Sequence, residues 1–359
     1  MTGVECIHFW CDPDVPLDMV SEWDPDSEPW RFASGLGHNL LELYVRLRDR
    51  GYPITLGPHV PRDAGLVVVY PSGSIWQSRR LARLGWRVRR HRVALLCSDL
   101  PPRYGALIRS DLQIMPNDRQ ASRKASSRYL PPLPQRGVVP RDPDVQATPW
   151  VLAFKGNPEN APDYLLDVNF QEALKKLGIE LDLDTPTRTD GSDQHWHDYS
   201  RTDWVLLDRK YSSYGNPAWK PPTKLLNAWH AGVIPLMVAE PAYVALARPG
   251  IDALMFDDVE ELLAVLGELC SSPALREQLS AGVRARHAVL ESSQEVVDAY
   301  WQAFQDHAGV PTRTRAAISM QCLIRCLIRV RFVRLMDRLN RIVSARSLRV
   351  GQTVDVGSA

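Results

Sequence analysis

Short apolar runs alternate with helical patterns through both halves of this 359-residue chain. Such alternation is typical of parallel sheets covered by helices, because a crossover between two parallel strands is long enough to contain a helix. The runs expected to form strands are Cys6–Trp10, Pro53–Leu56, Gly65–Tyr70, Val93–Cys97, Trp150–Phe154, Trp204–Leu207, Val233–Val238 and Ala253–Phe256. The helices expected near the end of the second half are Val259–Cys270, Pro273–Leu290 and Gln294–Phe304. The pattern predicts an α/β fold with doubly wound sheets.

A proline-rich stretch, residues 129–149, separates the two sets of expected strands. Proline breaks helices and cannot donate a hydrogen bond within a sheet, so we expect a linker here. The sequence then divides into an N-terminal Rossmann-like domain over residues 1–147, a C-terminal Rossmann-like domain over residues 148–308 and a tail over residues 309–359. Two such domains face one another across a cleft, and ligands bind at the carboxyl ends of their strands.

The composition narrows the class of protein. The chain is 45% apolar and 24% charged with a formal net charge of +1, which fits a globular protein and argues against binding to nucleic acid. Its six cysteines are scattered, and the opening "MTGVECIHFW" has no basic region before an apolar stretch, so we expect a reducing, cytoplasmic location without a signal peptide. No apolar run approaches the roughly 20 residues that a membrane-spanning helix needs.

The most informative segment is "KPPTKLLNAWHAGVIPLM", residues 220–237. Its two prolines suit the first turn of a helix and Gly232 suits the C-terminal cap, which predicts a helix over about residues 222–231. The free N–H groups at its start, together with Lys220 and Lys224, would form a place for a diphosphate. The alternative is an ordinary amphipathic helix with solvated lysines.

Residues 224–235, "KLLNAWHAGVIP", resemble the donor-site helix of glycosyltransferases with the GT-B fold, of the group 1 and fucosyltransferase types. The downstream segment 239–279 keeps the order of that family: an acidic loop with a tyrosine, a short strand, an Asp-rich turn, and two helices. Thr223 stands where the fucosyltransferase form has a glutamate. Many retaining members carry two glutamates where this chain has Trp219 and Asn227, so retaining and inverting stereochemistry both stay open.

The resemblance implies a set of residues that bind a nucleotide-sugar donor. Lys224 would stabilise the leaving diphosphate, and Glu240 would replace the missing carboxylate on the ribose. The donor-binding residues implied are Lys155, Gly156, Arg209, Lys220, Thr223, Lys224, Asn227, Glu240 and Tyr243.

A glycine loop in residues 32–57 opens a helix after the first strand, and in this family the equivalent loop lines the acceptor side of the cleft. Gly35, Gly37 and His38 are therefore expected on that side. Some inverting members keep a histidine near the first strand, so His38 is the first candidate for a general base and Asp99 is the second. The alternative for His38 is a histidine at a helix start that bonds to the backbone.

Two groups of residues have spacings that metals use. The first is a possible zinc set, Asp193, His195, His197 and Asp198. The second group is three Asp-Pro-Asp triplets, at residues 12–14, 24–26 and 142–144. A central proline fits exposed turns, and none of the triplets follows a convincing buried strand, so we expect no metal and no cofactor other than the nucleotide sugar.

The implied function is transfer of a sugar from a nucleotide sugar to an acceptor hydroxyl, by a hexosyltransferase-type enzyme of envelope polysaccharide or glycolipid synthesis. Two alternatives remain: a sugar-nucleotide epimerase or hydrolase on the same fold, and a non-catalytic protein that binds sugar nucleotides. The missing glutamate pair favours the non-catalytic alternative. Product analysis separates these functions.

The tail has a different composition from the rest of the chain. Residues 315–349 are rich in arginine, and Asp337 is their only acid. Apolar residues recur there at helical spacing: Ile324, Ile328, Phe332, Leu335, Leu339 and Ile342. The pattern predicts a basic amphipathic helix on an anionic membrane surface, at the inner face of the cell membrane, which suits a glycan or lipid-linked acceptor. The alternative is a helix packed on the protein's own acidic surface or on a second subunit.

Overall fold

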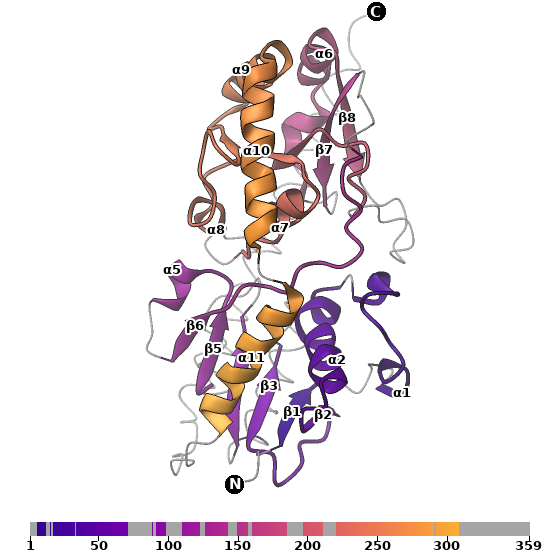
Figure 1. Cartoon of the computed structure of the whole chain (residues 1–359), viewed down its shortest axis with the longest axis vertical. Coiled ribbons are helices and arrows are strands. Elements are labelled where there is room, and N and C mark those ends of the chain that lie inside the picture. Colours follow the sequence, from indigo (N-terminus) through magenta and orange to yellow (C-terminus); the bar gives the residue numbers. More distant parts are fainter. Residues whose placement is uncertain are drawn as a thin grey trace, which may run out of the picture.

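The computed structural model contains two parallel sheets with helices packed against them (Figure 1). It describes residues 6–11, 15, 17–32, 34–70, 88, 91–97, 110–122, 126–142, 149–156, 160–184, 197–210, 220–290 and 292–308. The first sheet has six strands in the order β2-β1-β3-β4-β5-β6, and the second has five in the order β11-β10-β9-β7-β8. All strand pairings among the described residues are parallel, which confirms the expected α/β class with two Rossmann-like sheets.

The first sheet contains the four strands expected in this half and two others. Its strands are β1 Ile7–Trp10, β2 Ile54–Gly57, β3 Leu66–Val69, β4 Arg92–Leu96, β5 Leu112–Met115 and β6 Ser127–Tyr129. Strands β3 and β4 are buried throughout, as expected of continuous apolar runs in a parallel sheet. The pattern of apolar runs did not predict β5 and β6. β6 is a short edge strand with a polar Ser-Arg pair, so it lacks an apolar run that would reveal it.

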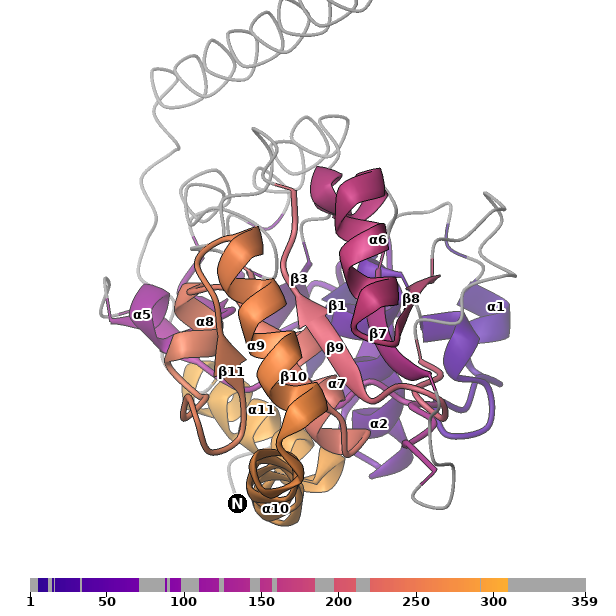
Figure 2. The ribbon, with the colours of Figure 1, turned by 90° about the horizontal axis from the view of Figure 1, so that it is seen from above.

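The second sheet contains β7 Trp150–Lys155, β8 Ile179–Asp184, β9 Trp204–Leu207, β10 Ile234–Met237 and β11 Leu254–Met255. Figure 2 shows these strands from above, side by side across the domain. β8 was not expected, because its "IELDLD" pattern alternates acidic and apolar residues. It pairs with β7 along its whole length at the edge of the sheet, where one polar face is tolerated.

The helical elements of the described residues are α1 Leu17–Val20, η1 Pro29–Phe32, the π-helical turn η2 Gly37–Leu41, α2 Glu42–Asp49, α5 Asp118–Ala121, η5 Asp163–Leu166, α6 Val168–Lys176, α7 Thr223–His230, α8 Pro241–Val244, α9 Val259–Ser271, α10 Pro273–Val289 and α11 Ser293–Ala308. Local caps explain where several of them begin. The Asp258 carboxylate accepts a hydrogen bond from the Glu261 N–H at 2.9 Å, and Ser272 caps α10 just before Pro273. Helices α9, α10 and α11 therefore form close to their expected ranges.

Helix α11 packs on the first sheet. Its Phe304 lies edge-on to Phe9 of β1 with ring centroids 6.0 Å apart, and Trp301 stacks on Tyr52 at 4.1 Å. Figure 1 shows the helix in the lower half, in front of the first sheet and beside α2. The expected range 148–308 grouped this helix with the second half. An amphipathic pattern shows that a helix has an apolar face, and it does not show which sheet that face covers.

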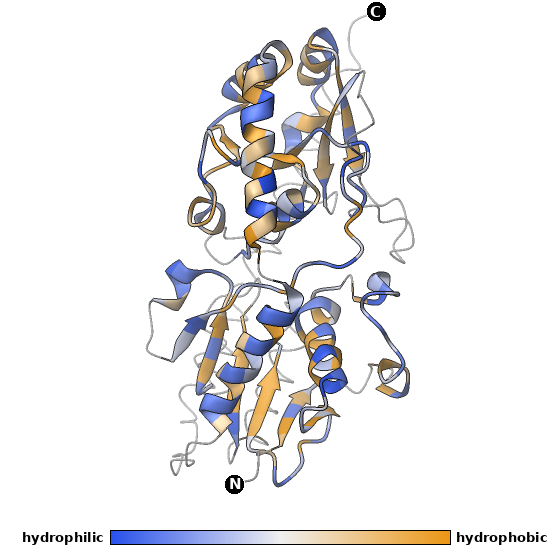
Figure 3. Ribbon diagram, viewed as in Figure 1, coloured by the Kyte–Doolittle hydropathy of each residue, from blue (hydrophilic) through white to orange (hydrophobic). Residues whose placement is uncertain are grey.

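The hydrophobic clusters of the first half are separate from the core of the second, and the proline-rich stretch connects the two halves. Leu133 lies in the core of the first sheet, whereas Val138 packs against the core of the second. Figure 3 shows β3 of the first sheet as hydrophobic and α11 as largely hydrophilic on the side in view. After β5, the Asn117 side-chain N–H donates to the Lys220 carbonyl at 3.5 Å, so the carboxyl end of the first sheet faces the start of α7.

Candidate active site

Helix α7 has a fixed position at the carboxyl end of β9. Leu225 and Trp229 are buried in the second core, and the Trp229 indole N–H donates to the Asp252 carbonyl at 2.9 Å. The helix ends before Gly232, which has a φ of +71°, a conformation that favours glycine. The expected helix and its glycine cap are therefore present, and the first turn points toward the other half of the molecule.

Lys224 lies in that first turn, and its ammonium group is buried. The Nζ atom sits 4.2 Å from the centroid of the Phe154 ring, although other parts of the residue remain partly exposed. A Cβ placed on Gly156 would lie only 3.1 Å from this Nζ, so the glycine leaves room for the ammonium group. Among the residues that the structure describes, Lys224 Nζ has no hydrogen-bond partner. A buried cation without a partner is unfavourable, and an anion at this position would relieve it.

The surroundings of Lys224 change its acidity. The pKa of Lys224 falls from 10.5 to about 7, chiefly because of burial and also because of the neighbouring Arg209 charge. Glu240 and Asp208 act in the opposite direction and offset only part of this effect. The ammonium group therefore titrates near neutral pH in the absence of a ligand.

Arg209 is held by two side chains that follow β10. Its Nε donates to Glu240 Oε1 at 2.6 Å, and its Nη2 donates to the Tyr243 hydroxyl at 2.7 Å. Burial alone would lower the pKa of Arg209, but Tyr243 and Glu240 raise it above its ordinary value. Burial raises the pKa of Glu240, although the Arg209 charge opposes this shift. Glu240 is fully buried, and its Oε2 has no partner among the described residues.

Other expected donor residues have partners of their own. Lys155, at the end of β7, donates to Asp182 of β8 at 2.9 Å. The Lys220 carbonyl accepts the hydrogen bond from Asn117 described above. The positive charge of the Lys220 side chain lowers the pKa of Lys224. Thr223 begins α7 directly before Lys224. The structure therefore gathers most of the predicted donor residues around one helix start, while Lys155 is engaged in an ion pair.

The sequence pattern did not predict a hydrogen-bonded pair, Tyr164 and Asp208, at the same edge of the second sheet. The Tyr164 hydroxyl donates to Asp208 Oδ2 at 2.8 Å, and the Arg209 N–H donates to Asp208 Oδ1 at 2.6 Å. Burial, with the charge of Asp208, raises the pKa of Tyr164 well above its ordinary value. Asp208 directly follows β9, so its place at a carboxyl strand end was the available signal.

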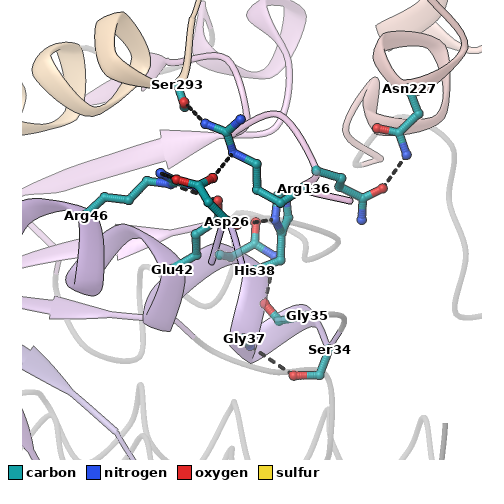
Figure 4. Close-up of polar contacts among 12 residues, drawn as sticks. Asp26, Ser34, Gly35, Gly37, His38, Glu42, Arg46, Arg136, Asn227 and Ser293 are labelled. Atoms are coloured by element: carbon teal, nitrogen blue, oxygen red, sulfur yellow. Dashed lines mark hydrogen bonds and ion pairs between the residues drawn. The ribbon is translucent and has the colours of Figure 1, made fainter. Parts of the chain in front are cut away.

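Asn227 contacts the linker between the two halves. Its Nδ2 donates a hydrogen bond to Gln135 Oε1 (Figure 4). The residue is buried, and its Oδ1 has no partner within the described part of the chain. The amide oxygen is therefore available as a hydrogen-bond acceptor for a hydroxyl group.

On the opposite side, the glycine loop places His38 in the π-helical turn before α2. The Gly37 N–H donates to the Ser34 hydroxyl at 2.9 Å, and a Cβ on Gly37 would lie 2.9 Å from Phe32 Cα, which explains the glycine. His38 Nδ1 lies 3.1 Å from Glu42 Oε2 (Figure 4). The side chain therefore bonds to a carboxylate, and the expected alternative of a backbone bond is wrong.

The contact with Glu42 indicates which ring nitrogen of His38 carries the hydrogen. An ionised carboxylate can only accept, so in the neutral imidazole Nδ1 carries the hydrogen and Nε2 carries the lone pair. Nε2 is buried and has no partner among the described residues. This is the arrangement that a general base requires.

Several predicted residues lie outside the described part of the chain. They are Asp12, Asp14, Asp99, Asp144, Asp193, His195, Trp219 and the tail after residue 308. Of the zinc candidates, Asp198 accepts a hydrogen bond from the Ser200 N–H, and the carbonyl of His197 accepts one from the Val139 N–H. Asp26, from the second Asp-Pro-Asp triplet, pairs with Arg46. No group of three or more His, Cys, Asp and Glu side chains in the described ranges is arranged to hold a metal.

Comparisons with known proteins give matches in structure alone. No protein-family model matches the sequence, and no curated protein matches it. Sucrose-phosphate synthase (tll1590) from Thermosynechococcus elongatus matches with a TM-score of 0.57 at 11% identity, over 84% of this chain and 98% of that one. WaaG, a glycosyltransferase involved in lipopolysaccharide biosynthesis, matches with a TM-score of 0.52 at 13% identity, over 82% and 98%.

Anabaena Alr3699/HepE in complex with UDP and glucose gives a TM-score of 0.52 at 10% identity, over 84% of this chain and 100% of that chain. These matches extend over both sheets, and they agree with the motif at the start of α7. The chain therefore has the two-domain GT-B fold of glycosyltransferases.

Proposed function

We propose that the chain is a glycosyltransferase that moves a sugar from a nucleotide-sugar donor to an acceptor hydroxyl. The observation that carries this proposal is the Lys224 ammonium group, which is buried at the start of α7 without a hydrogen-bond partner among the described residues. A diphosphate oxygen would accept a hydrogen bond from this ammonium group. HepE, which has the same fold, holds UDP in its structure, so UDP is the first probe for this site.

The unpaired atoms around Lys224 also fit the rest of such a donor. Asn227 Oδ1 and Glu240 Oε2 are hydrogen-bond acceptors, whereas Lys224 Nζ is a donor. Each buried polar atom without a partner is unfavourable by about 1–3 kcal/mol. The hydroxyl groups of a ribose or a sugar would satisfy the two oxygens, and the diphosphate would satisfy the lysine. A nucleotide sugar combines both kinds of group in one molecule.

In the transfer step, the bond between the anomeric carbon and the phosphate oxygen breaks, and a bond to the acceptor oxygen forms. Negative charge develops on the leaving diphosphate, and Lys224 with the start of α7 stabilises it. Arg209 contributes its charge from a position held by Glu240 and Tyr243. Binding both substrates across the cleft supplies the rest of the rate enhancement through proximity.

The proton of the acceptor hydroxyl needs a base if the enzyme inverts the anomeric centre. We propose that His38 Nε2 takes this proton, since Glu42 holds Nδ1 and leaves Nε2 with its lone pair. Asp99 remains the second candidate for this base.

The experiment that tests the proposal is a thermal-shift panel of UDP, ADP, GDP and their sugar derivatives, followed by product analysis with the nucleotide sugar that stabilises most. Release of free nucleotide that needs an acceptor indicates transfer. Release into water indicates hydrolysis, an altered sugar on intact nucleotide indicates epimerisation, and stabilisation without turnover indicates a binding protein. No stabilisation by any nucleotide would refute the donor site.

The affinity for UDP is expected to fall as the pH rises above 7. Free Lys224 has a pKa of about 7, and a bound diphosphate favours its charged form and raises that pKa. Above pH 7 the complex then holds a proton that the free protein lacks, so affinity decreases by up to about tenfold per pH unit. Calorimetric titrations with UDP from pH 6.5 to 9 measure this slope. Lys224→Arg should flatten it, and a flat profile for the wild type contradicts the prediction.

We propose a membrane role for the tail, residues 309–359, from its sequence pattern. No helix of the described residues is long and apolar enough to cross a bilayer. Basic amphipathic segments bind anionic surfaces with roughly 1 kcal/mol per basic residue. The full chain should therefore sediment with vesicles as their anionic lipid content rises, and a variant that ends at Val310 should stay in the supernatant. Equal recovery of both in the pellet would defeat this proposal, which includes a lipid-linked acceptor at the inner face of the cell membrane.

A further inference from the structure

The chain passes between the two halves at residues 134–137 and again between Leu290 and the start of α11 at Ser293. On the first passage, Leu133 belongs to the first core and Val138 packs on the second. On the second passage, Leu290 packs on the second core and Val296 belongs to the first. The relative placement of the two halves therefore depends on how these two passages are held.

Arg136 connects the two passages. Its guanidinium Nη2 donates to the Ser293 hydroxyl at the start of α11, and its Nε lies 3.0 Å from Asp26 Oδ1 (Figure 4). A hydrogen bond from Arg46, together with the charges of Arg46 and Arg136, lowers the pKa of Asp26 below its ordinary value. One side chain therefore ties the first passage to the second and to the segment before η1.

The contacts continue from Asp26 to the candidate base. Arg46 donates to Asp26 Oδ1 at 3.1 Å and to Glu42 Oε1 at 2.9 Å, and Glu42 in turn bonds to His38 at 3.1 Å. Figure 4 shows these side chains as one connected row from Ser293 to His38. The position of the candidate base is thus linked to Arg136 through ionic contacts.

Gln135, the residue before Arg136, contacts the donor side. It accepts the hydrogen bond of Asn227 from α7, one turn after Lys224. Adjacent linker residues therefore contact the donor helix α7 directly and the acceptor-side helix, η2 with α2, through Asp26 and Arg46. This adjacency links the two halves of the site at one point of the backbone.

The backbone next to these two residues is closely packed and hydrogen-bonded. Gly137 has a φ of +75°, and a Cβ there would lie 2.7 Å from Pro29 Cγ. Beyond it, the Val139 N–H donates to the His197 carbonyl and the Arg141 N–H donates to the Ala231 carbonyl, both at 2.8 Å. The linker is thus attached to the second half directly after the passage.

We propose that Arg136 is a positioning residue, which sets the placement of the acceptor-side helix relative to the donor helix and touches neither substrate. The inference rests on the proposed function for its catalytic consequence. Transfer requires the reacting atoms to approach within about 3–3.5 Å, and a misplacement of about 1 Å reduces rates by up to about 100-fold. Loss of Arg136 should therefore reduce turnover without removing a contact to the donor.

The test compares full-length wild type, Arg136→Ala and Arg136→Lys by small-angle X-ray scattering without nucleotide. The control is Arg128→Ala, which removes an ion pair of 3.3 Å between β6 and Asp306 of α11 on the first half alone. Arg136→Ala should give a larger radius of gyration and a broader distance distribution. Arg136→Lys, which keeps the charge facing Asp26, should restore most of the wild-type curve, and Arg128→Ala should match wild type.

Function is measured on the same variants with UDP binding by calorimetry and turnover of the nucleotide sugar chosen by the thermal-shift panel. Arg136→Ala should keep its UDP affinity within about twofold of wild type and lose about tenfold in kcat. A scattering curve identical to wild type would overturn the inference. If Arg136→Ala does not fold, Asp26→Asn and Ser293→Ala each remove one of its contacts, and wild-type scattering in both would overturn it equally. A wild type that binds no nucleotide removes the proposed function but leaves the scattering comparison decisive for the placement of the two halves.

Discussion

Replacing Lys224 with methionine should reduce the affinity for UDP by about 30-fold or more. The substitution removes the ammonium group at the start of α7, which has no hydrogen-bond partner among the described residues and is the cation proposed to meet the diphosphate. A charged contact of this kind contributes on the order of 2 kcal/mol, which corresponds to the stated factor. Calorimetric titration of UDP into both proteins at pH 6.5 measures the change.

The same substitution should make the folded protein more stable near neutral pH. The pKa of Lys224 is 10.5 in the unfolded chain and about 7 in the fold, so between these values the unfolded state binds more protons. The free energy of unfolding of the wild type therefore rises as the pH increases from about 7 to about 10.5. At pH 7 the buried lysine still lowers this free energy, and methionine removes that destabilisation. Lys175→Met, on an exposed face of α6, is the matched control for both measurements. Unchanged UDP affinity in Lys224→Met would remove this helix start from the site.

The substitution Gly282→Ala should destabilise the second half by about 3 kcal/mol or more. Gly282 lies in α10, and a Cβ there would overlap the carbonyl oxygen of Ile251 and lie 2.6 Å from its carbonyl carbon. The turn that contains Ile251 cannot easily retreat, because Arg286 of α10 holds Asp252 with a hydrogen bond of 2.6 Å. Thermal unfolding should show a midpoint lower by on the order of 5–10 °C.

Gly267→Ala provides the matched control for that prediction. Gly267 lies inside α9, and its added Cβ would meet only the end of Leu177 at 3.9 Å, an ordinary contact. Alanine in a helix interior is more favourable than glycine by roughly 0.5–1 kcal/mol, so this variant should melt at or above the wild-type temperature. Equal midpoints for Gly282→Ala and wild type would show that the helix and the turn can separate at little cost.

The sequence predicted the parts of the fold that depend on local pattern. Buried parallel strands such as β4 are continuous apolar runs, and α7 begins at prolines and ends at a glycine with positive φ. Both signals depend on only a few neighbouring residues, so they can be recognised without knowing which segments pack against them. The resemblance at residues 224–235 predicted the start of α7 as the donor side, and the structure gathers Gly156, Arg209 and Glu240 around it.

The tertiary structure alone decided which distant groups meet and what charge each one keeps. Strand β8 depends on β7 for its pairing, α11 crosses to the first sheet, and Asn227 bonds to the linker at Gln135. None of these contacts has a local sequence signal, because each requires two segments far apart in the chain to pack together. The same holds for the pKa of Lys224, which falls because packing against Phe154 excludes water from its ammonium group. Burial is a property of the folded molecule, so the sequence located this lysine and only the fold determined its chemistry.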